Sequence, residues 1–284
     1  MKDKVFLCVG GDKRQVYMCR ALSAQGKVCA LGLPGEDETF EAIDDLTEMD
    51  LKADVLVLPF MPQEGDIPLS GGGAISLSQL CGMTADGGIV IGGRLTDEHR
   101  AVISSFGLDC ADYYENESLT LKNCVPTAEG TLMTAMQNTD RTIAGSRVLV
   151  TGFGRTAKVC ASLFKAVGAE VTVTARRTDA GAEARTMGLG FIPLYSVKAR
   201  LNGYDIIINT VPALILTEDL LEAVSREALI IDIASKPGGT DFHAAERLGI
   251  RAVHALALPG RCAPVTAGEI IAETVIDILH ERGK

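Results

Sequence analysis

The sequence predicts an α/β protein with two domains, each built on a mainly parallel sheet. The chain has 284 residues, a length that suggests about two domains. Short apolar runs alternate with helical segments through both halves, as in parallel sheets that are covered by helices. A glycine-rich turn, Gly152–Ala157, stands halfway along the chain. A second domain that begins near this turn therefore follows a separate first domain.

The composition indicates an ordinary globular protein, with 47% hydrophobic and 23% charged residues. The net charge of −10 excludes a bulk attraction to nucleic acid or to an anionic membrane, because both need a basic surface. No apolar run approaches the roughly 20 residues that span a bilayer, and the first residues lack the pattern of a secretory signal. We therefore expect a cytoplasmic protein with no nucleic-acid or membrane partner.

The eight cysteines are scattered along the chain and include no CxxC pair. This spacing fits neither a zinc site nor a disulfide framework. We expect reduced thiols that behave as small hydrophobic residues, and no bound metal.

The first domain is expected to cover residues 1–125. Its predicted strands are short and apolar, as buried parallel strands are: Val5–Val9, Lys27–Leu33, Asp54–Phe60 and Gly88–Gly93. Helices are predicted between them at Arg14–Ala24 and Phe40–Glu48. The Gly- and Pro-rich stretch from Pro59 to Gly73 is typical of a loop at one end of the sheet.

A linking helix is predicted over residues 126–145. Pro126 suits a first helical turn, where its missing N–H costs little, and Glu129 complements the positive end of the helix. The second domain, residues 146–263, then has predicted strands at Arg147–Gly152, Glu170–Ala175, Tyr204–Thr210, Ala228–Ser235 and Ile250–Leu256.

The last segment, residues 264–284, is predicted to be a helix that returns to the first domain. Thr266 and Glu269 have the Ser/Thr-x-x-Glu spacing of a capping box. An apolar helical face follows, made of Ile270, Ile271, Thr274, Val275, Ile278 and Leu279. This face can serve the first domain or a dimer, and we expect a homo-oligomer.

The turn at Gly152, Phe153, Gly154, Arg155, Thr156 and Ala157 has the GxGxxA pattern of dinucleotide-binding domains. It lies between a predicted strand and a predicted helix, inside a βαβ unit. The first glycine permits a tight turn, the second lets the backbone approach a pyrophosphate, and the small Ala157 lets the helix pack on the strand. The second domain is therefore predicted to be a Rossmann domain, and the first a smaller flavodoxin-like or Rossmann-like domain.

The choice of cofactor depends on the end of the second strand of this unit. NAD sites usually place Asp or Glu there to bind the ribose hydroxyls. This chain has Arg176, Arg177 and Thr178 instead. Two guanidinium groups and a hydroxyl suit a 2′-phosphate better than a diol, so the sequence favours NADP over NAD. The alternative is that both arginines are ordinary surface residues.

Two further turns follow strands of the second domain. Asn209, Thr210, Val211 and Pro212 end one strand, and Lys236 lies in the turn after the next. Open α/β sheets place ligands beyond the carboxyl ends of their strands, so the first turn is expected beside the nicotinamide half of the cofactor. Lys236 could contact an anionic substrate or the cofactor, although a lysine in a polar turn is more often merely solvated.

A substrate site is expected from residues at other strand ends. Asp12 and Arg14 follow the first strand, Arg94 follows the Gly88–Gly93 strand, and Arg261 lies just before the last segment. Any of these arginines could bind a carboxylate. His254, at the last strand, is a candidate for proton transfer together with Lys236 and Arg94, although a structural histidine is the commoner case.

Motifs along the whole chain carry a family resemblance. They are Gly10-Gly11-Asp12, Asp112-Tyr113-Tyr114, Pro126-Thr127-Ala128-Glu129-Gly130, Gly152-Phe153-Gly154-Arg155, Asp232-Ile233-Ala234-Ser235 with Pro237-Gly238-Gly239, and Leu258-Pro259-Gly260 with Ala263-Pro264 and Thr266-Ala267-Gly268. In this order they resemble the family of dipicolinate synthase A chains of endospore-forming bacteria. The glycine turn occurs in many dehydrogenases, whereas the segments that begin at Pro126 and at Leu258 are far more specific.

The resemblance implies an oxidoreductase that converts a dihydrodipicolinate-type intermediate to pyridine-2,6-dicarboxylate, with NADP as hydride acceptor. It also implies a flavoprotein-like second subunit of dipicolinate synthase as partner, and a role in the mother cell during sporulation. Aromatisation supplies a strong driving force, so the protein mainly needs to position a dicarboxylate substrate and accept a proton. Residue roles beyond the glycine turn are inferred from the residues alone.

Two other functions are compatible with the residues. One is a 2-hydroxy-acid or amino-acid dehydrogenase of the same plan, which needs a histidine–carboxylate pair; His99 with Asp97 or Glu98 is a loose candidate. The other is a nucleotide-binding partner subunit that carries no chemistry, since no unmistakable acid/base group is visible in the sequence.

Overall fold

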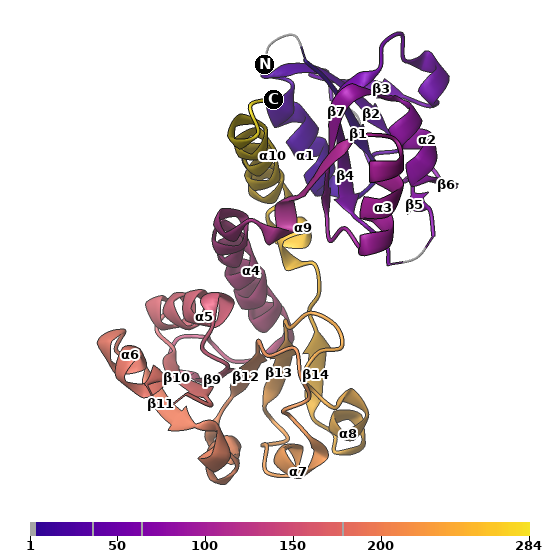
Figure 1. The fold of residues 1–284 in the computed structure, drawn as a ribbon. Helices are drawn as coiled ribbons and strands as arrows, with labels where there is room; N and C mark the ends of the chain where they lie inside the picture. Colours follow the sequence, from indigo (N-terminus) through magenta and orange to yellow (C-terminus); the bar gives the residue numbers. More distant parts are fainter. Residues whose placement is uncertain (1–3, 36, 64, 178) are drawn as a thin grey trace. The chain divides into compact units, whose positions relative to one another are not determined.

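The computed structural model describes residues 4–35, 37–63, 65–177 and 179–284, which form two compact units (Figure 1). The first unit runs up to Asn123 and also includes Ala263–Lys284, while the second is Cys124–Cys262. Each unit contains a six-stranded parallel sheet with helices on both faces. The predicted α/β fold with two parallel-sheet domains is therefore confirmed.

The sheet of the first unit has the strand order β3-β2-β1-β4-β7-β8. Numbered along the chain, this is the doubly wound order in which two βαβ halves meet between the first and fourth strands. A short antiparallel pair, β5 (Ile67–Pro68) and β6 (Ala74–Ile75), follows β4. The strands of the sheet are β1 (Lys4–Val9), β2 (Gly26–Leu31), β3 (Glu41–Ile43), β4 (Ala53–Phe60), β7 (Thr84–Gly93) and β8 (Asp109–Asp112).

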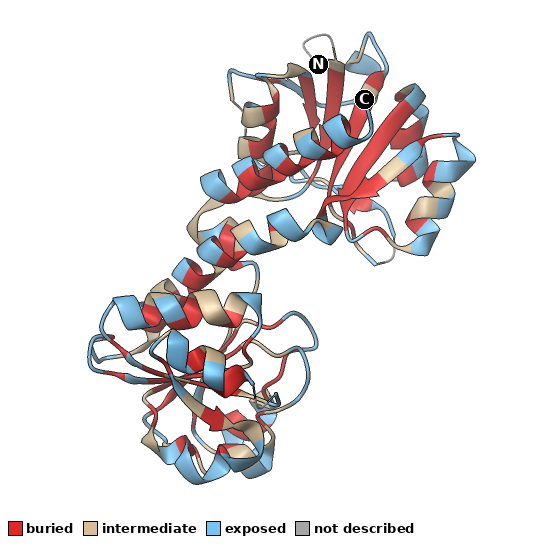
Figure 2. Cartoon of the chain, turned by 60° about the vertical axis from the view of Figure 1, so that its left-hand side comes forward, coloured by how far each residue is buried: buried red, intermediate tan, exposed pale blue. Residues whose placement is uncertain are grey.

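The helices of the first unit cover both faces of this sheet. Side chains alternate along β1, so that Phe6 and Cys8 pack toward one helix pair while Leu7 and Val9 pack toward the other. The first pair is α1 (Lys13–Leu22) and α10 (Pro264–Glu281), and the second is α2 (Leu77–Gly82) and α3 (Asp97–Ser105). Figure 2 shows the resulting pattern of buried strands and half-exposed helices.

Helix α10 packs against α1, so the predicted return of the last helix to the first domain is confirmed. The two helices approach closely at Gly268. A Cβ atom at this position would lie 2.8 Å from Cβ of Tyr17 and 2.9 Å from the backbone nitrogen of Met18. Ile271 and Val275 continue the buried face of α10.

The second unit has the sheet order β11-β10-β9-β12-β13-β14, which is again the doubly wound Rossmann order. Its strands are β9 (Arg147–Thr151), β10 (Glu170–Ala175), β11 (Gly190–Pro193), β12 (Ile206–Asn209), β13 (Leu229–Asp232) and β14 (Arg251–His254). Its helices are α5 (Arg155–Ala166), α6 (Ala180–Thr186), α7 (Glu218–Leu221), α8 (Phe242–Arg247) and α9 (Leu258–Cys262), and α4 (Glu117–Asn138) contributes its later turns.

The predicted helix Phe40–Glu48 is wrong. Residues Glu41–Ile43 form the edge strand β3, which pairs with β2, and only Leu46–Glu48 make a single 3₁₀ turn. The carboxylate of Asp45 accepts a hydrogen bond from the backbone N–H of Thr47, at 2.8 Å. Such local bonds from aspartate to the backbone favour turns over helix interiors.

The predicted start of the linking helix and the predicted cap of the last helix are also wrong. Helix α4 begins at Glu117 and ends at Asn138, so Pro126 lies inside it rather than in its first turn. Helix α10 begins at Pro264, with Ala263 at the N-cap, so Thr266 already lies within the first turn and makes no cap. A proline at the first helical position has the fixed φ that a helix start requires, and this favours the start of α10 at Pro264, where the last segment was predicted to begin.

In the described part of the chain, no helix is long and apolar enough to cross a membrane. The same residues contain no cluster of three or more His, Cys, Asp or Glu side chains placed to hold a metal ion. All eight cysteines are free thiols, and six of them are buried.

The close approach of α10 to α1 generates a stability prediction. We expect Gly268→Ala to lower the free energy of unfolding by about 1–3 kcal/mol, because the added methyl group overpacks the helix contact. The control is Gly82→Ala at the end of α2, where a Cβ meets no atom within 4 Å. That change is expected to be neutral or to stabilise by up to ~1 kcal/mol, as helix propensity predicts. Chemical denaturation followed by circular dichroism measures both; equal effects would contradict the close approach.

Candidate dinucleotide site and neighbouring strand ends

The second unit contains a cavity of about 660 Å³ at the carboxyl ends of β9, β10 and β12. Parallel sheets of this order bind ligands at that edge. Most of the predicted cofactor-binding residues line the cavity together. The lining residues are Gly152, Phe153, Gly154, Arg155, Lys158, Thr174, Ala175, Arg176, Arg177, Leu194, Thr210, Val211, Pro212, Ala213 and Ile215.

The glycine turn has the backbone that its pattern predicts. Gly152 has φ of +93°, and a Cβ there would lie 2.6 Å from Oγ1 of Thr210, so no other residue fits without strain. Gly154 is the N-cap of α5 and provides no side-chain cap. A Cβ at Gly154 would meet no protein atom within 4 Å, so open space lies in front of the helix.

These features fit a dinucleotide pyrophosphate. The start of the twelve-residue helix α5 provides the positive end of a helix dipole. Ala157 is almost fully buried, as the helix–strand packing of this motif requires. The side chain of Thr156 lies instead against Cys124 of α4, with 3.4 Å between its Oγ1 and the sulfur, so this residue does not line the cavity.

The two predicted arginines at the end of β10 both line the cavity, but they differ in their pairing. Arg177 forms an ion pair with Asp179 at 3.1 Å and lies 3.9 Å from Glu183. Arg176 is exposed and makes no ion pair with a residue that the structure describes. Thr178, which was predicted to join them, lies outside the described residues.

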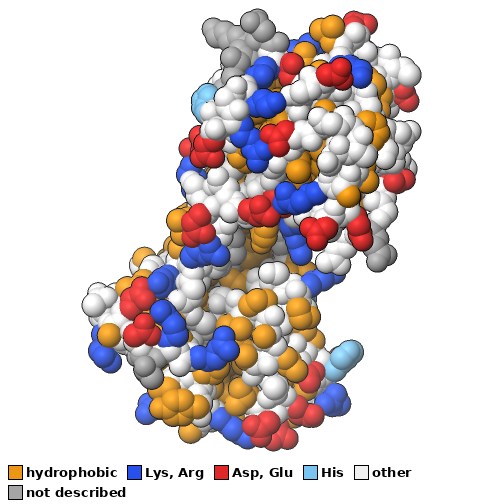
Figure 3. All heavy atoms as spheres, viewed as in Figure 1, with side chains coloured by type: hydrophobic (Ala, Val, Ile, Leu, Met, Phe, Trp, Pro, Cys, Tyr) orange, Lys and Arg blue, Asp and Glu red, His pale blue; other side chains and the backbone are white. Residues whose placement is uncertain are grey.

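Lys158 is a cavity residue that the sequence analysis missed. Its Nζ lies 2.6 Å from Oε1 of Glu183 on α6 and 5.3 Å from the centre of the Phe153 ring. Figure 3 shows basic and acidic side chains intermixed on the part of this unit that carries α5 and α6. The sequence signal that could have identified Lys158 was its position one turn into the helix that follows the glycine turn; in the structure it lines the cavity.

A buried hydrogen-bond network fixes the strand ends beside the cavity. Oδ1 of Asn209 accepts from Oγ1 of Thr151 at 2.7 Å, and Nδ2 of Asn209 donates to Oδ1 of Asp232 at 2.8 Å. Asp232 also accepts from the backbone N–H groups of Ala234 and Gly239, at 3.0 and 2.9 Å. The side chain of Asn209 is thus fully engaged inside the protein and positions the Thr210–Pro212 turn without itself lining the cavity.

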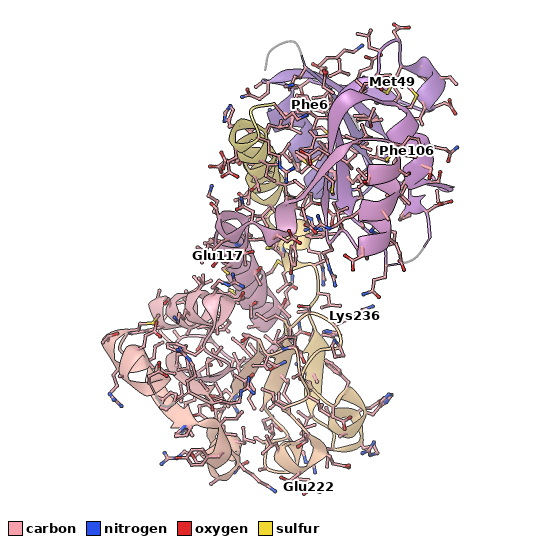
Figure 4. All side chains as sticks on the ribbon, viewed as in Figure 1. Phe6, Met49, Phe106, Glu117, Glu222 and Lys236 are labelled. Carbon is pink, nitrogen blue, oxygen red and sulfur yellow. The ribbon has the colours of Figure 1, made fainter. Side chains whose placement is uncertain are left out.

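The two predicted catalytic residues of this unit have different surroundings. Lys236 is exposed on the loop that leaves β13 (Figure 4). His254 stacks on Phe242 with ring centres 5.1 Å apart. Its Nε2 is buried without a hydrogen-bond partner among the described residues, and it lies 3.6 Å from the place a Cβ of Gly238 would take. Lys236 is therefore the more accessible of the two.

In the first unit, Asp12 and Arg14 pair with each other at the end of β1. Nε and Nη2 of Arg14 donate to the two carboxylate oxygens of Asp12, at 2.9 and 2.8 Å. The guanidinium lies 5.0 Å from the ring centre of Phe60. Burial alone would raise the pKa of Asp12, but the hydrogen bonds and charge of Arg14 together lower that pKa below its ordinary value. Arg14 is thus held in a fixed position by Asp12, and its other N–H groups could donate to a ligand.

Arg94 and Arg261 are exposed. Arg94 has φ of +60°, which is uncommon for a residue with a side chain, and its N–H donates to Oδ1 of the buried Asp112 at 3.0 Å. His99 is not a catalytic candidate on this geometry, because its Nδ1 accepts a hydrogen bond from the backbone of Thr96 and so caps α3.

Comparisons with known proteins agree with this architecture. Residues 5–114 match the family model of the N-terminal domain of the dipicolinate synthase A chain. Residues 122–235 match the model of the D-isomer specific 2-hydroxyacid dehydrogenase NAD binding domain. A full-length relative is the dipicolinate synthase A chain of Bacillus subtilis (strain 168), which is 33% identical over 283 residues, covering 96% of this chain and 95% of the relative. The protein belongs to the family of dipicolinate synthase A chains.

Solved structures of this family have the same fold. The dipicolinate synthase A chain of Bacillus halodurans has a TM-score of 0.87 at 32% identity, and 98% of each chain is covered. The A chain from Bacillus subtilis has a TM-score of 0.85 at 32% identity, with 99% of this chain and 97% of that chain covered. The protein is thus an oxidoreductase of dehydrogenase type, whose second unit is an NAD(P)-binding domain.

The open space in front of Gly154 generates a binding prediction. We expect Gly154→Ala to weaken dinucleotide binding about 10-fold, because the methyl group enters the space that a pyrophosphate needs. The melting temperature should stay unchanged, since φ of Gly154 is −86° and the methyl group meets no protein atom. Calorimetric titration with NADP⁺ and NAD⁺ measures the affinity. Undiminished binding of both would show that the pyrophosphate does not pass this helix start.

Proposed function

We propose that the protein oxidises a dihydrodipicolinate-type intermediate to pyridine-2,6-dicarboxylate, with NADP as the hydride acceptor. The observation that carries the cofactor assignment is the cavity itself, which has the glycine turn at Gly152–Gly154 and both arginines after β10 on its wall. The described residues that line it include four basic side chains and no acidic one. A cavity wall of this composition suits the 2′-phosphate of NADP, whereas an NAD site usually offers a carboxylate at this strand end.

The bound nicotinamide would supply the hydride acceptor, and the protein must supply position and a proton acceptor. Oxidation of a dihydropyridine ring removes one hydride and one proton, so one basic group has to take the proton. We assign that role to the neutral amine form of Lys236, which is exposed beyond the carboxyl end of β13; its ammonium form has no electron pair to accept a proton. His254 is a weaker candidate because its Nε2 is turned into the protein. Arg94 would contribute charge rather than proton transfer, since a guanidinium stays protonated.

The substrate is a dianion, and a protein of net charge −10 must bind it with local donors. We propose Arg14, Arg94 and Arg261 for this role. Asp12 would act through Arg14, because it holds that guanidinium in a fixed orientation at 2.8–2.9 Å.

The family name suggests the cellular setting. The relatives are named as one of the chains of a synthase, and we propose that this protein works with a flavoprotein-like second subunit of dipicolinate synthase. We also propose a homo-oligomer that acts in the cytoplasm of the mother cell during sporulation. The alternative is a protein that binds nucleotide but is inactive without its partner. The exposure of Lys236 favours this alternative, because an exposed side chain is not a base that the protein holds in a fixed position.

The first test of this function is turnover. Purified protein mixed with freshly generated dihydrodipicolinate and NADP⁺ is expected to raise the absorbance of reduced nicotinamide, with a much smaller rate for NAD⁺. A preference for NAD⁺ would reject the assignment of NADP while keeping the reaction. No rate above the spontaneous oxidation, despite tight NADP⁺ binding, would favour the partner-dependent alternative.

A second test concerns the proposed base. We expect Lys236→Met to lower kcat by about 100-fold or more, as loss of a general base does, while NADP⁺ binding stays within about twofold. The control is Lys198→Met, another exposed lysine of this unit, which pairs with Asp219 away from the cavity. Steady-state kinetics over a pH range measures both. Normal turnover of the Lys236 variant would reject the assignment.

A further inference from the structure

The basic residues around the cofactor cavity are not equivalent. The cavity is lined by Arg155, Lys158, Arg176 and Arg177. Lys158 and Arg177 are already paired with carboxylates, whereas Arg176 has no ion pair within the described parts of the chain. At Arg176, Arg177 and Lys158, a ligand phosphate would therefore meet one guanidinium without a described ion pair and two cations that are already partly neutralised.

Glu183 on α6 is the residue that joins the two paired cations. Its Oε1 lies 2.6 Å from Nζ of Lys158, and its Oε2 lies 3.9 Å from Nη2 of Arg177. One carboxylate thus connects a side chain from α5 with one from the turn after β10. All three side chains remain partly exposed, at 42% for Glu183, 34% for Lys158 and 61% for Arg177. Pairs with this exposure are weak and can exchange partners.

We propose that Glu183 determines the phosphate specificity of the cofactor site by competing with the ligand for Lys158 and Arg177. This inference rests on the proposed function, because it assumes that the cavity binds a dinucleotide. Without ligand, the carboxylate of Glu183 forms ion pairs with both cations at the cavity wall. When a dinucleotide with a 2′-phosphate binds, its dianion takes over these cations beside Arg176, and Glu183 loses them to the ligand. NAD has no phosphate at this position and leaves the pairs intact.

The physical argument concerns charge. The 2′-phosphate carries up to two negative charges and accepts several charge-assisted hydrogen bonds, so it binds guanidinium and ammonium groups more strongly than one carboxylate does. Glu183 opposes this binding in two ways: it occupies the cations, and it repels the phosphate. Both effects act on NADP and neither acts on NAD. Removing the charge of Glu183 is therefore expected to strengthen NADP binding. If Glu183 merely oriented Lys158, the same change would weaken NADP binding.

The test compares Glu183→Gln with the wild-type protein by calorimetric titration with NADP⁺ and, separately, NAD⁺. The glutamine keeps the size of the side chain and removes its charge. We expect the dissociation constant for NADP⁺ to fall about 3- to 10-fold, and that for NAD⁺ to change less than about twofold. The matched control is Glu222→Gln beside α7, which makes the same change of net charge and lies well apart from α5 and α6 (Figures 1 and 4). It should alter neither constant.

The ratio of the two dissociation constants decides the proposal. An unchanged ratio in Glu183→Gln would overturn it, and so would weaker NADP⁺ binding, which would make Glu183 a positioning residue. Arg176→Ala provides a second measurement: it should weaken NADP⁺ binding in both backgrounds, because Arg176 needs no release from Glu183. If the wild-type protein prefers NAD⁺, the NADP assignment fails, yet the change in ratio still decides the role of Glu183. Failure to bind either nucleotide would reject both.

Discussion

The cavity of the second unit depends on one buried carboxylate. Asp232 has no cationic partner within the described residues, and it is held by the Asn209 side chain and two backbone N–H groups. A buried charge needs such donors, because its water has been removed. Asn209 in turn accepts a hydrogen bond of 2.7 Å from the hydroxyl group of Thr151, which connects β9 to the same network. The ends of β9, β12 and β13 are therefore fixed together, and the glycine turn, the Thr210–Pro212 turn and the loop carrying Lys236 all start from these ends.

Both units have the same strand order, yet they use their carboxyl ends differently. In the second unit the polar network lies inside the sheet edge, and four basic side chains remain around an open cavity. In the first unit the side chain of Arg14 is itself part of the packing. It is buried, donates hydrogen bonds to Asp12 and lies over the ring of Phe60. A guanidinium fixed in this way has lost its conformational freedom before any ligand arrives, which reduces the entropy lost on binding.

Much of this architecture was readable from the sequence, because buried parallel strands are short continuous apolar runs and the glycine turn has strict steric requirements. Three of the four edge strands were missed: β3, β8 and β11 lack such runs, whereas the equally short edge strand β14 was predicted. The helix errors arose where tertiary packing or local hydrogen bonds overrode a simple rule, as at Pro126 and Asp45. At the site, residue types at the strand ends were predictable. Their pairing was not, because Glu183 follows Lys158 by 25 positions and only the fold brings them together.

Pairing of this kind changes what a residue can do. Arg176 and Arg177 are adjacent and chemically identical, so the sequence assigns them the same role. In the structure Arg176 makes no ion pair with a described residue, whereas Arg177 is held by Asp179 beside Glu183. The same distinction separates Lys236, whose amine is exposed, from His254, whose Nε2 is buried against Gly238. Since a proton acceptor must reach its substrate and a phosphate ligand must find uncommitted charge, accessibility and existing partners decide function among residues that the sequence treats alike.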